Sequence, residues 1–423
     1  MLSFSRGLWR HQNFMLLWAG QTVSLFGTQI TTLALPTIAI LLLHVTPFEV
    51  GVLAAIPWVA YLGLGLFAGV IVDRMPRRIV MMIADIGRAV ALGSIPLAFT
   101  LGVRSIYHLY LVAAIVGILN VFFEIAYHSY LPTQVEPGEL IEGNAKLSLG
   151  DGAAQMGGPA LAGFLIELLG AALAIITDAI SYLLSALTLL RITARESKKE
   201  TVQGTNVLAE MREGIKLVLR HPIIRILITV SSVQNIGSSM ADTAILLFAY
   251  RTLHLTPGIV GLTFTLGSAG FVLGAVTASA ITRKLGGGPT LVFSSLLGTL
   301  SYLVIPLGLL GAPILWIGLF RLFLGLHIPT YNVNTVSLRQ TVIPAQLQGR
   351  VAATALTLAF GSLSLGFLLG GLLASTWGLV ATIICGGIVF LIGSLPLLSR
   401  VIVSYKNPSS AVVSEATLQN QPL

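Results

Sequence analysis

The chain has 423 residues, of which 55% are hydrophobic and only 9% are charged, whereas soluble globular proteins carry about 25% charged residues. This composition excludes a soluble globular protein and indicates a chain that lies mostly in a membrane. The formal net charge is +8, but the basic residues gather in short loops without interleaved aromatic residues, so nucleic acid is not an expected partner. Cys385, the single cysteine, lies in an apolar run and is interpreted as a packing residue.

Division of the apolar runs at charged residues, Pro and Gly predicts twelve membrane-spanning helices in two sets of six. The first set is expected at residues 13–42, 49–71, 79–102, 106–127, 141–168 and 171–191. The second set is expected at residues 222–249, 258–281, 289–310, 313–334, 345–373 and 377–399. The predicted fold class is therefore an all-α integral membrane protein with two six-helix bundles.

The longest polar stretch divides the chain into two predicted domains. Residues 192–221 are expected to be a cytoplasmic linker between an N-terminal bundle, residues 1–191, and a C-terminal bundle, residues 222–400. Residues 401–423 are expected to be a cytoplasmic tail. Within the linker, apolar residues recur at helical spacing from 208 to 218, which predicts an amphipathic helix that lies either on the membrane surface or in solvent.

Lys and Arg are distributed unevenly over the predicted loops. With the N-terminus in the cytoplasm, Arg104 and Arg251 lie outside and Arg88 and Arg321 lie within spans, which leaves 20 of the 24 basic residues on the cytoplasmic side. The positive-inside rule therefore predicts a multi-pass protein of the cell membrane with both termini in the cytoplasm.

The two halves share short motifs, most of them at an offset of 210 residues. Thr-Pro-x-x-Val-Gly at residues 46–51 recurs at residues 256–261, and Arg-His at residues 10–11 recurs at residues 220–221. Parallel repeats of six helices are typical of alternating-access carriers, because two similar bundles can rock about a site at the membrane midplane.

The loop after the second predicted span carries a charged motif. It reads Gly69-Val-Ile-Val-Asp73-Arg74-Met-Pro-Arg77-Arg78. This segment resembles the signature loop of the major facilitator superfamily, Gly-x-x-x-Asp-Arg-x-Gly-Arg-Arg, with Pro76 at the position of the second Gly. The resemblance implies that the Gly permits close helix packing and that the Asp and Arg residues latch the two halves together on the cytoplasmic side. Alternatively, the arginines only set the topology.

The fifth predicted span contains a second family motif. Gly157-Gly158-Pro159-Ala-Leu-Ala-Gly163 resembles the Gly-Pro-x-x-Gly-Gly motif of drug and metabolite exporters in this superfamily. Gly158, Pro159 and Gly163 are therefore expected to form a helix-packing segment that pivots against the opposite bundle, with generic small-residue packing as the alternative. Residues 210–222 and 344–351 resemble the exporter branch that includes macrolide-efflux proteins and the enterobactin exporter.

Polar residues inside the spans are candidates for proton coupling or substrate binding, because each is expensive in lipid and normally faces protein or water. In the superfamily's arrangement, spans 1, 4, 7 and 10 line a central cavity. That arrangement selects Asp242, Glu124, Arg321, Asn120, Gln29, Gln234 and Asn235. Asp85 and Arg88, three residues apart on one helix, are expected to form a structural ion pair, and Asp178 is also expected to be structural.

The predicted function is secondary active transport, namely proton-coupled efflux of a small amphipathic compound of the drug, macrolide or siderophore class. The chain has no P-loop motif for ATP, so no cofactor is expected and the proton gradient is the expected energy source. An uptake carrier and a lipid flippase are alternatives with the same fold. A membrane enzyme is a weaker alternative, because neither His-Glu-x-x-His nor Gly-x-Ser-x-Gly occurs. No catalytic residues and no metal site are predicted, and the expected partners are a small-molecule substrate and the lipid bilayer, with the protein itself a monomer.

Overall fold

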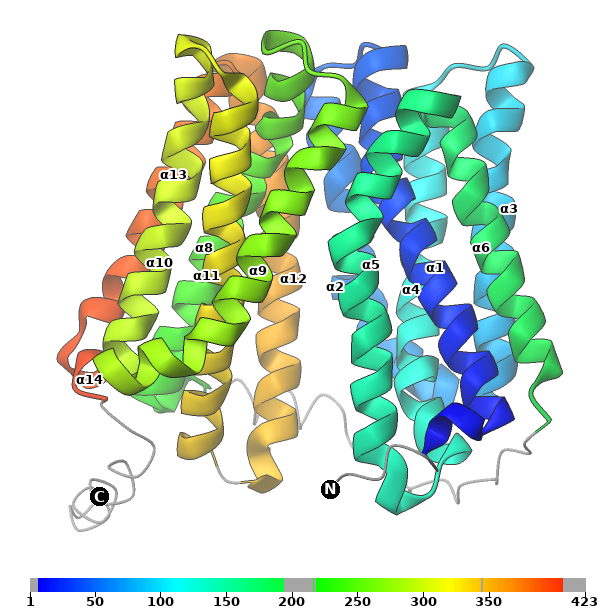
Figure 1. The fold of residues 1–423 in the computed structure, drawn as a ribbon, viewed down its shortest axis with the longest axis horizontal. Helices are drawn as coiled ribbons and strands as arrows, with labels where there is room; N and C mark the ends of the chain where they lie inside the picture. Colours follow the sequence, from blue (N-terminus) through cyan, green and yellow to red (C-terminus); the bar gives the residue numbers. More distant parts are fainter. Residues whose placement is uncertain (1–6, 194–215, 217, 344, 406–423) are drawn as a thin grey trace. The chain divides into compact units, whose positions relative to one another are not determined.

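The structure is a computed structural model that describes residues 7–193, 216, 218–343 and 345–405. This part of the chain contains twelve long helices and no strand, which confirms the predicted fold class. The first six helices (Figure 1) are α1 (Gln12–Thr37), α2 (Pro47–Arg74), α3 (Arg77–Thr100), α4 (Ile106–Gln134), α5 (Leu140–Leu169) and α6 (Ala171–Arg191). The second six are α8 (Pro222–Leu247), α9 (Pro257–Leu285), α10 (Gly287–Val304), α11 (Pro313–Val342), α12 (Ala345–Thr376) and α13 (Leu379–Ser394). The predicted amphipathic linker helix lies almost entirely outside the described residues.

Contacts between the helices divide the chain into two units. Unit 1 comprises Met1–Gly204 and His254–Thr265, and unit 2 comprises Thr205–Leu253 and Leu266–Leu423. Helix α9 is therefore shared, because its first turns pack with unit 1 whereas the remainder belongs to unit 2.

The two units are built on the same packing plan. In unit 1, α1 packs against α5 and α6, and α3 packs against α4 and α6. In unit 2, α8 packs against α12 and α13, and α10 packs against α11 and α13. Each of these four contacts of unit 1 has a counterpart six helices later in unit 2, so the sequence repeat is also a structural repeat.

The repeat extends to local backbone conformation. Helix α1 runs into the π-helical turn Ile38–Leu42, and α8 runs into the π-helical turn Phe248–Thr252, 210 residues later. Each turn is followed by a histidine in the left-handed region, His44 at φ 51° and His254 at φ 52°, a conformation that commonly ends helices. The Thr-Pro pairs then begin α2 and α9, because a threonine hydroxyl caps free N–H groups and proline suits the first helical position.

The helices have the composition of a membrane protein. Within the described residues, ten helices are long and apolar enough to cross a membrane. The remaining two, α5 and α8, have 30 and 26 residues, which is sufficient length, but they contain many small and polar residues. Large apolar side chains such as Leu183 and Leu187 on α6 are exposed, as expected for a surface that faces lipid.

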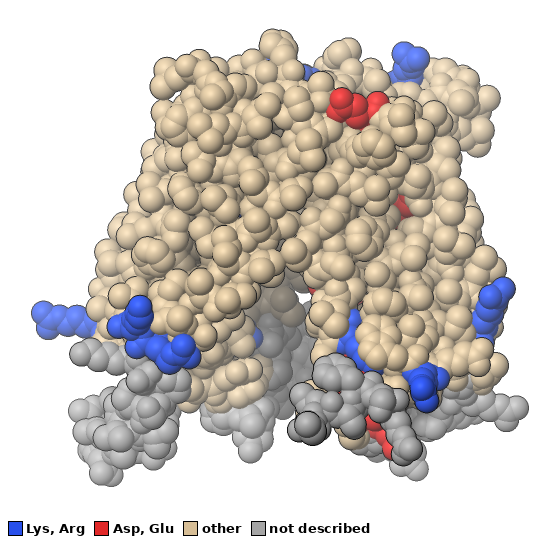
Figure 2. Space-filling model, in the orientation of Figure 1, with Lys and Arg blue, Asp and Glu red and all other residues tan. Residues whose placement is uncertain are grey.

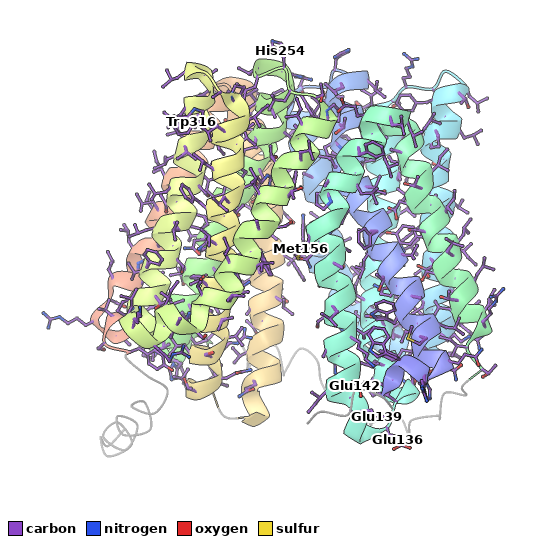
Figure 3. The ribbon with its side chains drawn as sticks, viewed as in Figure 1. Glu136, Glu139, Glu142, Met156, His254 and Trp316 are labelled. Carbon is purple, nitrogen blue, oxygen red and sulfur yellow. The ribbon has the colours of Figure 1, made fainter. Side chains whose placement is uncertain are left out.

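Charged side chains lie mainly near the ends of the helices in each unit, and the surface between them on the face shown in Figure 2 is almost uncharged. In unit 1, Glu136, Glu139 and Glu142 lie at the end where α5 begins (Figure 3). The Glu142 carboxylate accepts hydrogen bonds from the backbone N–H of Leu8 at 3.1 Å and from Lys146 Nζ at 2.6 Å. These contacts fasten the residues before α1 to the start of α5.

Candidate functional site

The arginines of the predicted gating motif take three different positions. Arg74 is exposed at the end of α2, whereas Arg77 is buried at the start of α3. Arg78 donates hydrogen bonds to the carbonyl oxygens of Leu189 at 2.7 Å and Leu190 at 2.6 Å. These carbonyls belong to the last turn of α6, where a helix leaves carbonyl groups unpaired and its dipole favours a cation. Arg78 therefore fastens α3 to α6 within unit 1.

Gly69 and Asp73 complete the motif. A Cβ atom at Gly69 would meet no described atom within 4 Å, so the described residues do not show the close helix packing that the family resemblance implies for this glycine. The side chain of Asp73 lies outside the described residues. The latch therefore stays a prediction.

A buried polar cluster lies inside unit 1 around Arg88 on α3, which is 4% exposed. Arg88 forms an ion pair with Asp85, which confirms the predicted pair. Its Nη1 also donates to Asn120 Oδ1 on α4 at 2.7 Å. The guanidinium carbon lies 4.2 Å from the ring centroid of Phe123 and 4.1 Å from that of Tyr182 on α6. Hydrogen bonds and cation–π contacts together offset the cost of burying this cation.

Asp178 on α6 is completely buried. Its carboxylate accepts a hydrogen bond from the hydroxyl of Thr31 on α1 and another from Ser181 Oγ at 3.0 Å. Buried carboxylates require such partners because desolvation is expensive. Asp178 therefore ties α1 to α6, in agreement with the structural role expected for it.

Glu124 on α4 is the accessible carboxylate of this region. It is exposed and is hydrogen-bonded to the Tyr61 hydroxyl on α2, whereas Asp85 and Asp178 are 0% exposed. Asn120 lies one turn before Glu124, and its side-chain oxygen accepts a hydrogen bond from Arg88. Of these three carboxylates, Glu124 is therefore the one that is accessible at the surface of unit 1.

In unit 2 the structure brings Asp242 and Arg321 into one electrostatic site. Asp242 on α8 is exposed, Arg321 on α11 is half-buried, and the two charges interact. The buried Tyr302 on α10 lies near both of them. Sequence patterns did not indicate Tyr302 or Tyr61, because neither aromatic residue departs from the composition of an ordinary apolar helix.

Gln234 and Asn235, adjacent on α8, differ in environment. Gln234 is buried, and its Nε2 donates to Ser295 Oγ on α10 at 3.1 Å and to Ser394 Oγ on α13 at 2.9 Å. Asn235 is half-buried. The side-chain amide of Gln234 is therefore engaged in the packing of three helices of unit 2.

The glycines of the packing motif on α5 make two close approaches. A Cβ atom at Gly158 would lie 2.5 Å from Cγ of Gln29 on α1, and one at Gly163 would lie 2.7 Å from Cα of Gly261 in the first turns of α9. Pro159 supplies a carbonyl oxygen that would lie 2.8 Å from a Cβ atom at Gly261. These separations are shorter than van der Waals contact, so both positions on α5 require glycine in this conformation.

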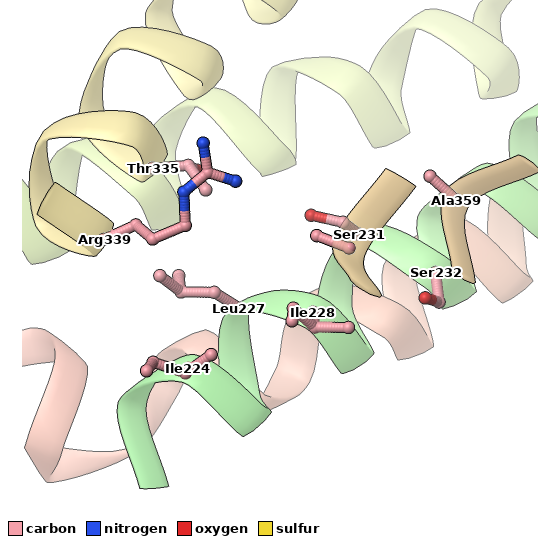
Figure 4. A pocket seen from close by; sticks show the side chains of 9 residues that line it. Ile224, Leu227, Ile228, Ser231, Ser232, Thr335, Arg339 and Ala359 are labelled. Atoms are coloured by element: carbon pink, nitrogen blue, oxygen red, sulfur yellow. The ribbon is translucent and has the colours of Figure 1, made fainter. Parts of the chain in front are cut away.

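A small open pocket, with a cavity volume of about 50 Å³, lies in unit 2 between α8, α11 and α12 (Figure 4). Most of its wall is apolar, including Leu227, Ile228 and Ala359. The guanidinium of Arg339 reaches from α11 into the cavity, and the hydroxyl of Ser231 lies across from it on α8. Mixed walls of this kind bind molecules that have both apolar and polar parts. Within the described residues, no group of three or more His, Cys, Asp or Glu side chains is placed to hold a metal ion.

Two units that repeat one six-helix plan, with ionisable groups inside apolar helices, define a helical membrane transporter. Residues 17–362 match the sequence profile of the Major Facilitator Superfamily. The chain belongs to this superfamily, and its family and fold are those of transporters. It is accordingly a multi-pass membrane protein whose fold implies a small-molecule substrate.

Two relatives extend over most of the chain. The MFS-type transporter YfiS of Bacillus subtilis (strain 168) is 26% identical over 407 residues, which cover 93% of this chain and 94% of YfiS. The multidrug efflux pump Tap of Mycolicibacterium fortuitum is 28% identical over 343 residues, which cover 79% of this chain and 80% of Tap.

Solved structures show the same fold. A bacterial homologue of the iron transporter ferroportin superposes with a TM-score of 0.75 at 17% identity and covers 93% of this chain and 99% of its own. The nucleoside transporter NupG superposes with a TM-score of 0.71 at 12% identity. The superposition covers 91% of this chain and 98% of the NupG chain. Proteins with different substrates thus share this architecture, so the fold leaves the substrate open.

Proposed function

We propose that this transporter is a proton-coupled exporter of small amphipathic compounds of the drug, macrolide or siderophore class. The observation that carries the proposal is the cavity of unit 2, whose apolar wall with one cation and hydroxyl groups suits a compound with an apolar body and a polar group. The similarity to the multidrug efflux pump Tap over 79% of the chain supports the outward direction.

The proton gradient is the proposed energy source, and Glu124 and Asp242 are the proposed proton-binding residues. Both carboxylates lie in long helices and are exposed, so each can take up and release a proton without unfolding a helix. Arg321 interacts with Asp242, and a change in that interaction during the cycle would change the proton affinity of the carboxylate. The protein is proposed to act as a monomer in the cell membrane.

We expect expression of the protein in a pump-deficient bacterial host to raise resistance to at least one amphipathic compound and to lower its cellular accumulation. The measurement is a panel of growth inhibition and accumulation assays that includes macrolides and siderophores. Increased accumulation would identify an uptake carrier, movement of labelled lipid without any change in drug accumulation would identify a flippase, and chemical modification of the compound would identify an enzyme.

A variant that fills the cavity tests its part in transport. Ala359→Phe places a ring in the cavity lined by Ala359, so we expect it to reduce efflux of bulky compounds at least about tenfold, the effect of about 1.4 kcal/mol. Leu187→Phe, on the exposed surface of α6, is the matched control. Parental efflux by a well-expressed Ala359→Phe protein would remove this cavity from the transport path.

The proposed topology has its own test. Reporters fused after Arg104 or Leu253 should be active outside the cytoplasm, and reporters fused within 195–205 or after Lys406 should be active inside it, because positively charged loops are retained in the cytoplasm. Opposite labelling at any two of these positions would contradict the proposed orientation.

A further inference from the structure

The N-termini of α2 and α9 occupy equivalent places in the repeat but are capped differently. Helix α2 caps itself: the Glu49 carboxylate accepts from the backbone N–H of Thr46 at 2.7 Å and from its hydroxyl at 2.8 Å, and the Glu49 N–H donates to Thr46 Oγ1 at 3.4 Å. This is a complete capping box. The position 210 residues after Glu49 is Ile259, which cannot supply a carboxylate.

In α9 the missing carboxylate comes from another helix. Glu167, near the end of α5, accepts a hydrogen bond from the hydroxyl of Thr256 at 2.8 Å and another from the backbone N–H of Gly258 at 2.6 Å. Thr256 Oγ1 also accepts from the N–H of Ile259 at 3.4 Å. The carboxylate of Glu167 therefore satisfies a free N–H group and places a negative charge at the positive end of the helix dipole.

The backbone around this cap is shaped to receive Glu167. A Cβ atom at Gly258 would lie 2.0 Å from a carboxylate oxygen of Glu167, so glycine leaves the room that the carboxylate occupies. One turn along each helix, Gly163 and Gly261 bring the two backbones into contact. His254, labelled in Figure 3, begins the segment that leads to this contact. The close approach and the hydrogen bonds hold the same short part of α9.

That part of α9 is the part that belongs to unit 1. Residues His254–Thr265 pack with unit 1, and α9 continues from Leu266 as part of unit 2. Any rearrangement of one unit relative to the other must therefore bend α9 or detach its first turns from α5.

We propose that Glu167 is a positioning residue of the transport cycle, which caps α9 from α5 and thereby holds the first turns of α9 on unit 1 until these turns are released. This inference rests on the proposed alternating-access function. It distinguishes the two repeats: the equivalent helix α2 keeps its cap in every state because the carboxylate is its own, whereas α9 loses its cap when it leaves α5.

The test measures the exposure of Val260, which is 2% exposed in the first turns of α9. In a Cys385→Ala background, Val260→Cys is labelled with a water-soluble maleimide in detergent-solubilised protein. We expect Glu167→Ala to raise the labelling rate at least about tenfold, because a state that loses about 1.4 kcal/mol relative to its alternative changes population by that factor. Glu49→Ala, which removes the equivalent carboxylate from α2, should leave the rate unchanged.

A second variant separates capping from linking. Ile259→Glu added to Glu167→Ala supplies α9 with its own carboxylate at the position that Glu49 holds in α2, so the helix is capped but no longer tied to α5. Labelling should then stay fast. Parental labelling of Glu167→Ala, or its return to the parental rate in the double variant, would overturn the proposal, since the second result would show that only helix stability matters.

Glu167→Gln keeps the shape of the side chain and removes its charge. We expect it to label Val260→Cys at a rate between those of the parent and Glu167→Ala, and it serves as the test if Glu167→Ala folds poorly. A parental rate in Glu167→Gln would likewise count against the proposal. Because labelling needs no transported compound, a failure of this proposal is distinguishable from a failure of the proposed efflux.

Discussion

Replacement of Arg88 by Met is expected to lower the melting temperature of the detergent-solubilised protein by on the order of 10 °C. The substitution would leave the Asp85 carboxylate buried without its cation, and removal of one partner of a buried ion pair costs about 3–5 kcal/mol. It would also remove the hydrogen bond to Asn120 and the stacking on Phe123 and Tyr182. Three helices of unit 1 would lose a common anchor.

The control separates charge from packing. Asp85→Asn combined with Arg88→Met removes both charges, so this double variant should recover a large part of the lost stability. Arg283→Met, an exposed basic residue near the end of α9, should change the melting temperature little. An Arg88→Met protein that melts within about 2 °C of the parent would show that the ion pair does not stabilise unit 1.

The largest functional effect is expected for Asp242→Asn and Glu124→Gln. For the exchange of one proton, a gradient of one pH unit is worth about 1.4 kcal/mol, which sustains about a tenfold concentration ratio of substrate. A variant that lacks the coupling carboxylate should only equilibrate its substrate across the membrane. The measurement is substrate accumulation and substrate-induced proton movement in proteoliposomes with an imposed pH gradient.

Glu139→Gln is the matched control, because this carboxylate lies at the end of unit 1 where α5 begins and not within a predicted span. If Asp242→Asn alone abolishes proton movement, Asp242 is the coupling residue and Glu124 serves another purpose. Full accumulation by both variants would mean that neither residue carries the proton.

Local sequence patterns predicted the helices well, and the two largest errors have one cause. The span expected at 171–191 coincides with α6, whereas α4 extends to Gln134 rather than 127 and α11 extends to Val342 rather than 334. Hydropathy marks where a helix is apolar enough for lipid, but backbone hydrogen bonding continues beyond that point. The boundary of an apolar run therefore underestimates the length of a helix that extends past the membrane.

The candidate site was predicted unevenly for a similar reason. Glu124 and Asp242 stand out because a carboxylate in an apolar run is rare, and the structure places both at accessible positions. Gln234 and Gln29 stand out equally in the sequence, yet the first bonds to Ser295 and Ser394 and the second packs over Gly158. Polarity alone does not reveal which amide is engaged in helix packing.

The sequence by itself determined the membrane class, the twelve helices, the internal repeat and the Asp85–Arg88 pair. Composition and the apolar runs set the first two, recurring motifs set the repeat, and the pair follows from helix geometry, which brings residues three apart onto one face. Only the tertiary structure decided that Arg78 caps α6 and that Glu167 caps α9, contacts that join residues 111 and 91 positions apart. Such contacts depend on how each helix is rotated and on where glycines let two backbones approach, which many residues in several helices determine together.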